Sequence, residues 1–304
     1  MKKTNLIIDT DPGVDDLIAI IPTLFDKRFD IKLFTTVSGN VDVDTCTRNL
    51  LHILEYCKKN IPVAKGAAKP LKRKPKDATF IHGPEGIGNY KITSEPNLKP
   101  IKKNAVEAMY ETICQNKGNI TIVLLGPQTN MAKLLLKHPD VTKMVKKIIF
   151  MGTSNYGKKK ITPNLKQNHV SFNASSDPEA LKIVLESGIP TIIIPSEIGR
   201  AAHLSEKEVL KLKEHRFVGD LVYNLLNGYW EPGTNPRVVS LNDACALLYL
   251  RLRPLFLVKR ADIILDTKEI PGRTFYKFKL TGKYKIITNV WLKVLHKFIN
   301  KISS

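Results

Sequence analysis

Cysteine is scarce in this chain, and the four that are present, Cys46, Cys57, Cys114 and Cys245, are widely spaced. They match no metal-binding or redox motif, and so few thiols in 304 residues indicate reduced cysteines instead of a disulfide framework. No apolar run approaches the length that spans a membrane, and the one near the start is too short for a signal peptide. These absences predict a cytoplasmic protein without a membrane partner.

Acidic residues are also in the minority, with 28 Asp and Glu against 48 Lys and Arg and a net charge of +20. The basic runs lie at residues 69–76, 99–103, 143–147 and 158–160 and near the C-terminus. Because these runs are scattered and no aromatic residues are interleaved with them, they favour a solvated surface and argue against a nucleic-acid partner. A polyanion that neutralises the charge is the alternative.

The acids that are present gather in residues 6–16, where an apolar run ends in four carboxylates within eight positions, Asp9, Asp11, Asp15 and Asp16. The first three residues predict a short buried strand, the following Pro-Gly pair predicts a turn, and the apolar spacing after Asp15 predicts a helix. Asp11 is therefore expected at the end of a strand, with Asp15 and Asp16 in the first helical turn. Asp9 is expected to point elsewhere, because side chains alternate along a strand.

Three carboxylates this close together repel one another, so either their pKa values rise or a cation neutralises them. An all-oxygen set favours a hard cation, Ca²⁺ or Mg²⁺. The alternative is that Asp15 and Asp16 only complement the helix dipole, each by about 0.3 kcal/mol. A cation site is favoured because ligands of open α/β sheets bind at the carboxyl ends of the strands.

Strand and helix signals alternate over about the first 200 residues, which predicts a largely parallel sheet with helices on both faces. Further strands are predicted at 261–265, 274–280 and 284–288, the last two paired as a hairpin that adds an antiparallel edge. Helices are predicted at 43–59, 104–116, 205–230, 242–252 and 291–302. No repeat or linker divides the chain, so residues 1–304 are predicted to form one domain.

The stretch of residues 9–16 matches without a gap the signature Asp-Thr/Cys-Asp-Pro-Gly-x-Asp-Asp, and in this the sequence resembles the inosine-uridine-preferring nucleoside hydrolases. A phosphatase of the Asp-x-Asp type is the nearest competitor, but there the second Asp is followed by Gly-Thr or a similar pair. Other segments stand in the family's order over nearly the whole chain: Ser38-Gly39-Asn40, Ile81-His82-Gly83, Gly126-Pro127-Gln128-Thr129-Asn130, Phe150-Met151-Gly152, Phe172-Asn173 and Asp177-Pro178-Glu179-Ala180. The resemblance implies a Rossmann-like, mixed but mostly parallel sheet flanked by helices.

The resemblance also implies a set of site residues. Ca²⁺ would be bound by Asp11, Asp16, Asp243 and the carbonyl of Leu125. The ribose would be contacted by Asp15, Asn40, Asn173 and one further Asn, either Asn164 or Asn168. Asp11 would act as the general base that takes a proton from the attacking water. From local sequence alone, Asn40 is equally well explained as a turn residue and Asn242-Asp243 as a helix cap.

Two positions depart from the family pattern. The family's His-Asp pair reads Asn242-Asp243, and an Asn donates a hydrogen bond but does not transfer a proton near neutral pH. Ser171 stands where the family has a Glu that binds the 5′ end of the ribose. Other candidates to meet the leaving base are His82, Tyr229, Trp230 and Arg237, of which Trp230 is equally well explained by packing.

The sequence thus predicts a Ca²⁺-dependent hydrolase that releases free base and ribose from purine or pyrimidine ribonucleosides for salvage. One alternative is a nucleoside-binding protein with weak or no hydrolysis, motivated by Asn242 and Ser171. Another is a hydrolase of modified or 5′-substituted nucleosides. The resemblance further implies a homo-oligomer, a dimer or a tetramer, and leaves the preferred base open.

Overall fold

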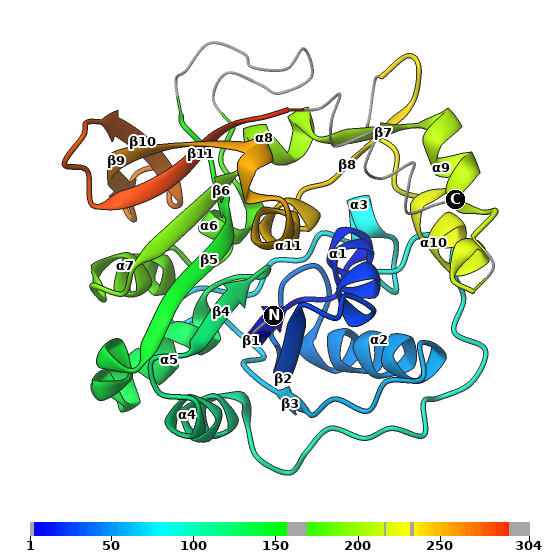
Figure 1. The fold of residues 1–304 in the computed structure, drawn as a ribbon, viewed down its shortest axis with the longest axis horizontal. Helices are drawn as coiled ribbons and strands as arrows, with labels where there is room; N and C mark the ends of the chain where they lie inside the picture. The colour runs from blue at the N-terminus through cyan, green and yellow to red at the C-terminus, as the bar shows by residue number, and fades with distance from the viewer. Residues whose placement is uncertain (1–2, 157–168, 216, 232–233, 292–304) are drawn as a thin grey trace.

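A nine-stranded sheet forms the centre of the computed structural model, which describes residues 3–156, 169–215, 217–231 and 234–291 (Figure 1). The strand order is β10-β9-β11-β6-β5-β4-β1-β2-β3. The strands are β1 Thr4–Thr10, β2 Phe29–Thr36, β3 Val63–Lys65, β4 Ile120–Leu124, β5 Val145–Thr153, β6 Thr191–Pro195, β9 Phe256–Asp266, β10 Arg273–Phe278 and β11 Tyr284–Val290. The strands β7 His203–Ser205 and β8 Val238–Ser240 pair separately.

The pairing confirms the mixed, mostly parallel sheet. β1 lies between β2 and β4, parallel to both, and the parallel order continues through β5 and β6 to β11. Within this sheet, the antiparallel pairings are those of β9 with its two neighbours, β10 and β11. Strand β1 is therefore central and buried, which explains why its apolar residues form an unbroken run instead of an alternating pattern.

The predicted hairpin between the last two strands is wrong. β10 pairs with β9, and β11 lies on the other side of β9, where it also joins β6. The cause is burial, because Tyr284, Ile286 and Ile287 of β11 are buried while most of β10 is only half-buried or exposed. The more apolar strand takes the interior position and the less apolar strand takes the edge.

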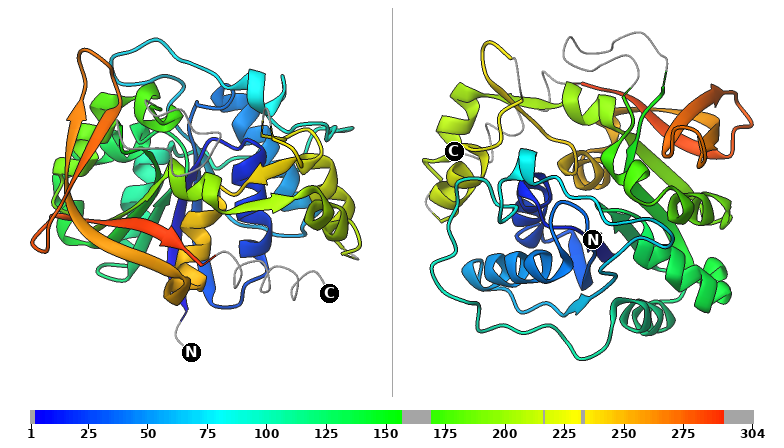
Figure 2. Two further views of the ribbon diagram at one scale, coloured as in Figure 1. Left: turned by 90° about the horizontal axis from the view of Figure 1, so that it is seen from above. Right: turned by 180° about the vertical axis from the view of Figure 1, so that it is seen from behind.

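Helices cover both faces of the sheet, in two separate apolar cores (Figure 2). One core contains α1 Val14–Leu24, α2 Val43–Tyr56, α10 Gly219–Leu226 and α11 Ala244–Arg251; the other contains α4 Ala105–Gln115, α5 Thr129–Lys137 and α7 Pro178–Glu186. Shorter helices are α3 Thr79–His82, α6 Phe172–Ser176, α8 Ser196–Ala201 and α9 Glu206–Leu212, with 3₁₀ turns η1 Pro139–Lys143 and η2 Arg253–Leu255. Within the described ranges, none of the helices is long and apolar enough to cross a membrane.

The single helix predicted at 205–230 is in fact two, α9 and α10, joined by a turn. Gly219 begins α10 and packs so closely on the backbone carbonyl of Lys213 that a Cβ atom there would overlap it. The chain therefore turns before it starts the second helix. The helix predicted at 291–302 lies almost entirely outside the described residues.

Candidate functional site

The predicted site residues meet at the carboxyl edge of the parallel strands. Asp11 directly follows β1, and Asp15 and Asp16 lie in the first turn of α1. The others come from distant segments: Asn40 after β2, Leu125 after β4, Asn173 in α6 and Asp243 at the start of α11. Parallel strands bring their carboxyl ends to one edge, which is where open α/β sheets bind ligands.

Asp16 is held by donors from three directions. Its Oδ2 atom accepts the backbone N–H of Gly13 at 3.0 Å and the side-chain amide of Asn40 at 3.0 Å. Its Oδ1 atom accepts the hydroxyl of Thr10, a contact that the sequence had not indicated. Burial, with the charge of Asp15 as a second cause, raises the pKa of Asp16 to about 7. The helix start and the carboxylate therefore hold each other in place.

Asp11 is buried beside two glycines. Its Oδ2 atom accepts the backbone N–H of Asn40 at 2.9 Å, and the amide of Asn40 also donates to the Asp11 carbonyl at 3.1 Å. A Cβ atom on Gly39 would overlap Oδ2, and one on Gly126 would lie 2.6 Å from Oδ1. Burial, followed by the charge of Asp16, raises the pKa of Asp11 well above its ordinary value.

The oxygen atoms best placed for a shared cation belong to Asp15, Asp16 and Asp243, which each offer one oxygen within 4.8 Å of the others. Burial and the charge of Asp15 raise the pKa of Asp243 well above its ordinary value. This donor set fits a hard cation. The sequence had placed Asp11, not Asp15, in the metal set, and Asp11 does not belong to this close group.

The sequence had suggested that the carbonyl of Leu125 is free to bind an ion. In the structure this carbonyl already has one hydrogen-bond partner. It accepts a hydrogen bond from the side-chain amide of Asn173, which also donates to the carbonyl of Met151 at 3.3 Å. Asn173 fits there because Gly152, with φ of +138°, has no side chain to meet it. A carbonyl oxygen has two lone pairs, so one remains for a further partner.

His82, Tyr229 and Asn242 surround Asp15 on the other side. His82 accepts the backbone N–H of Val14 on Nδ1 at 3.2 Å, which leaves the proton of the neutral ring on Nε2. Burial lowers the pKa of His82, so the ring is neutral near pH 7. Tyr229 stacks on it with ring centroids 5.0 Å apart and donates its hydroxyl to Asp15 at 3.0 Å. The amide nitrogen of Asn242 lies 3.5 Å from Asp15 Oδ2 and from the Tyr229 hydroxyl.

Some predicted residues are placed differently. Trp230 donates its indole N–H to the carbonyl of Asn227, and its ring faces the guanidinium of Arg237 at 5.2 Å. These contacts are those of a packing residue, and none of the contacts seen in the described ranges joins Trp230 to the carboxylates. Ser171 is buried directly before α6. Asn164 and Asn168 both lie outside the described residues.

Asp9 points away from the site, as predicted. Its carboxylate is fully buried on the opposite side of β1, where it accepts hydrogen bonds from the hydroxyl of Thr35 and the amide of Asn130, the latter at 2.7 Å. Asn130 also donates to the carbonyl of Thr36 at 2.8 Å. Asp9 thus ties β1 to β2 and α5 directly beneath Asp11.

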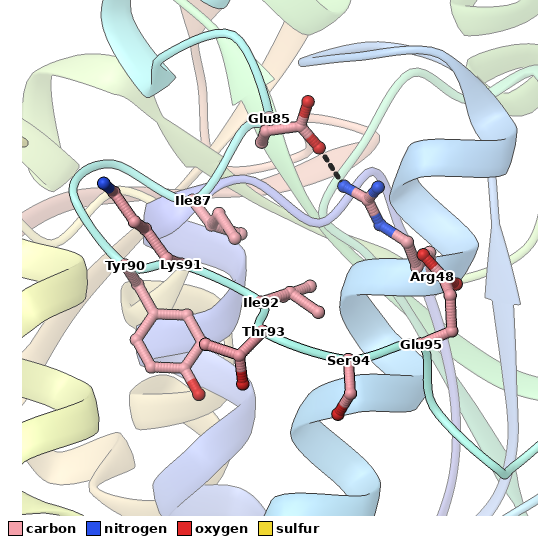
Figure 3. Close-up of a pocket in the computed structure, with 9 residues that line it drawn as sticks. All are labelled: Arg48, Glu85, Ile87, Tyr90, Lys91, Ile92, Thr93, Ser94 and Glu95. Carbon is pink, nitrogen blue, oxygen red and sulfur yellow. Dashed lines mark hydrogen bonds and ion pairs between the residues drawn. The ribbon is translucent and has the colours of Figure 1, made fainter.

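A surface pocket of about 420 Å³ is lined by Arg48 of α2 and by residues between Glu85 and Glu95 (Figure 3). Arg48 and Glu85 form an ion pair across one end of it, and Tyr90 lies at the other. The backbone carbonyl of Glu85 accepts the amide of Asn49 at 2.7 Å, so the pocket wall is tied to α2. Since none of the lining residues is a buried acid or a predicted site residue, we assign the chemistry to the carboxylate cluster.

The amino-acid sequence is similar to those of known proteins over most of its length. A family model described as inosine-uridine preferring nucleoside hydrolase matches residues 6–297. The non-specific ribonucleoside hydrolase RihC of Shigella flexneri serotype 5b is 34% identical over 263 residues, which cover 86% of this chain and 84% of that protein. RihC of Salmonella newport is also 34% identical, over 264 residues and 87% and 84% of the two chains.

Solved structures show the same fold. The plant nucleoside hydrolase PpNRh1 superposes with a TM-score of 0.88 at 25% identity, covering 99% of this chain and 98% of that one. A purine-preferring ribonucleoside hydrolase from Gardnerella vaginalis superposes with a TM-score of 0.88 at 24% identity and with the same coverage. At 24% identity, the similarity to the Gardnerella vaginalis structure supports only the fold.

Proposed function

Because the chain belongs to the inosine-uridine preferring nucleoside hydrolase family and is thus a ribonucleoside hydrolase, we propose that it cleaves the N-glycosidic bond of ribonucleosides with the help of a bound Ca²⁺ ion. The observation that carries this proposal is the meeting of Asp15, Asp16 and Asp243 within 4.8 Å. Two of these carboxylates are buried and have raised pKa values, and a cation bound between them would favour their ionised forms. The homo-oligomer expected from the resemblance stays a prediction.

The residues that would hold the ion are Asp16 and Asp243, joined by Asp11 or Asp15 and the second lone pair of the Leu125 carbonyl. Their oxygens are the ligand type that Ca²⁺ prefers. When bound, the ion lowers the pKa of the attacking water and orients the ribose diol. Asn40 and Asn173 border the same space, and their amide oxygens remain to accept hydrogen bonds from the ribose hydroxyls, because their N–H groups are already engaged.

In this proposal Asp11 is the general base. Because Asn40 engages its Oδ2 atom, Oδ1 is the atom left to take a proton from water. Gly126 keeps the approach to Oδ1 open, since any side chain there would crowd it. Burial alone raises the pKa of a carboxylate, and a buried base accepts a proton more readily than a solvated one.

The carboxylates also stabilise the transition state by their charge. Breaking the bond between C1′ and the base develops positive charge on the ribose ring. Asp15 borders the site on its more open side, with its Oδ2 atom fixed by the Tyr229 hydroxyl. A carboxylate that is already oriented stabilises the growing charge without reorganisation.

The leaving base would receive hydrogen bonds and no full proton. The Asn242 amide does not ionise, and His82 carries only the Nε2 proton of its neutral ring. Both groups sit beside Asp15, where the family's histidine is expected. Bases that leave easily as anions should therefore be cleaved best.

The proposal is tested by measuring free base released from a panel of ribonucleosides and their 5′-monophosphates, with and without a chelator. We expect release from ribonucleosides, its loss with chelator and its recovery with added Ca²⁺. Release that is indifferent to the chelator would contradict the Ca²⁺ requirement. Tight nucleoside binding without release would favour the alternative of a binding protein. Preferential release from the monophosphates would favour a 5′-substituted substrate, which the neutral Ser171 permits.

A further inference from the structure

The amino-terminal edge of the sheet, opposite the carboxylates, carries a row of basic side chains. Lys147 is the third residue of β5 and Lys285 the second residue of β11, with β6 between the two strands. Ile149 pairs with Ile192, and Ile192 pairs with Lys285. Because side chains alternate along a strand, Lys147 projects from the same face as Ile149 and hence as Lys285.

The row continues onto β9, since Lys285 pairs directly with Arg260. From β5 to β9 there are three strand spacings, so these cations span about 14 Å. Burial, followed by the charges of Lys146, Arg253 and Lys285, lowers the pKa of Lys147, which shows that Lys146 and Arg253 lie close to these cations. We call Lys146, Lys147, Arg253, Arg260 and Lys285 the basic row.

The acids on the neighbouring elements are engaged with other cations. Asp262, two residues from Arg260, pairs with Lys279. Asp26 pairs with Arg28 and with Arg251. Within the described ranges, no ion pair joins a residue of the basic row to an acid. The guanidinium of Arg260 donates to the backbone carbonyl of Gly282 at 3.0 Å. The positive charges of the row thus have no carboxylate at ion-pair distance in the described part of the chain.

Such a grouping was not visible in the sequence, where Lys146 and Lys147 lie more than 100 residues before the other three members. The strand order brings the two parts together, and the mutual repulsion of these cations opposes folding unless anions gather there. One phosphate group meets only one or two members of a row of about 14 Å. A nucleic-acid strand carries one negative charge at every nucleotide along its length, so it meets the whole row.

We propose that the basic row is a docking surface for a single-stranded polynucleotide, held through its phosphates. The row runs across the strands at one edge of the sheet, and in the described ranges none of its members lies on an α-helix that would enter the groove of a duplex. No aromatic side chain belongs to it, so binding rests on the backbone charges and carries little base preference. The net charge of +20 steers the polyanion to the protein.

The surface is tested by fluorescence anisotropy with a labelled oligouridylate over a series of salt concentrations. Lys146 and Lys285 are exposed, so the double variant Lys146→Glu/Lys285→Glu should fold. We expect it to bind at least about tenfold more weakly, with a salt slope reduced by about 0.7 for each lost contact. The matched control is Lys207→Glu/Lys211→Glu on α9, which changes the net charge equally and should bind about as tightly as the parent protein.

Three outcomes would overturn the proposal: no binding by the parent protein at low salt, an equal loss in both double variants, or binding to phosphatidylserine vesicles without binding to the oligonucleotide. The second would show an effect of overall charge, and the third a membrane surface. Nucleoside hydrolysis should be unchanged in both double variants, because the row lies at the edge opposite the site. The binding measurement does not depend on hydrolysis, so each proposal fails separately.

Discussion

The two edges of the sheet each gather charges of one sign, but in opposite surroundings. At the carboxyl edge the acids are buried, and backbone and amide donors such as those of Gly13 and Asn40 hold them in place. At the amino edge most of the basic side chains are exposed and reach into solvent. Water and salt screen the exposed charges, whereas the buried ones interact strongly. Burial therefore makes the acidic cluster a candidate site for a cation, while the basic row stays a solvated surface.

Loss of the proposed base should produce the largest effect. Asp11→Asn keeps the shape and one oxygen of the side chain but removes its basicity. We expect kcat for a good ribonucleoside to fall at least about a hundredfold. Asp30→Asn, a change at a half-buried carboxylate at the other end of the sheet, is the control and should leave kcat unchanged. A normal rate in Asp11→Asn would remove Asp11 from the mechanism.

Substitutions of buried acids on the two sides of β1 should affect Ca²⁺ binding differently. Asp16→Ala removes an acid of the cluster, while Asp9→Asn removes the charge of an equally buried acid on the opposite side. Calorimetry with Ca²⁺ should show binding lost in the first variant and kept in the second. Retention of full affinity in Asp16→Ala would show that the ion is held elsewhere.

The buried acids should also make the metal-free protein less stable as the pH rises. The pKa of Asp16 is about 7 in the folded protein, against an ordinary value of 3.8, so the folded state binds the proton more tightly. Without Ca²⁺, this group's contribution to the free energy of unfolding is then greatest at low pH and is lost between about pH 4 and pH 7.

Asp16→Asn isolates that contribution, because Asn has a similar shape and no charge. In the presence of chelator we expect the variant to be more stable than the parent protein above pH 7, by at least about 1 kcal/mol. The advantage should disappear near pH 4. Denaturant unfolding at several pH values measures it, and a difference that does not change with pH would show that Asp16 titrates normally.

Restoring the family's histidine should sharpen the leaving-group side of the site. Asn242→His places a group beside Asp15 and Tyr229 that can carry a proton. We expect about a tenfold gain in kcat for inosine or uridine and little change for a p-nitrophenyl riboside, whose leaving group needs no proton. An equal effect on all three substrates would point to a change in the pocket's shape. If the unaltered protein already cleaves all three at similar rates, His82→Ala should slow the natural nucleosides selectively.

The smallest effect is expected at Ser171. A carboxylate at that position would repel a 5′-phosphate, by about 1 kcal/mol at close range in water. Ser171→Glu should therefore improve kcat/KM for uridine by a few-fold and reduce any activity on its 5′-monophosphate. If uridine is preferred by both proteins and the variant loses nothing on the monophosphate, substrates with a 5′-phosphate are excluded.

Local sequence was sufficient to predict those features of the structure that depend on residues close together in the chain. The apolar run, the Pro-Gly turn and the helical spacing placed Asp11 at the end of a strand and Asp16 in the first turn of a helix, while side-chain alternation turned Asp9 away. These features follow from backbone geometry over a few residues. The resemblance then named Asn40, Asn173 and Asp243 as their companions, because the family's motifs stand in the same order in this chain.

Only the tertiary structure decided which distant residues meet. Strand β11 lies between β6 and β9, which brings Lys285 to the same edge and face of the sheet as Lys147. The same position of β11 is incompatible with the hairpin between β10 and β11 that the sequence had favoured. The stacking of Tyr229 on His82 and the approach of Asp243 to Asp15 likewise join segments that are far apart in the chain. Such contacts depend on which strand or helix buries the most apolar surface at each position, and that competition involves the whole chain at once.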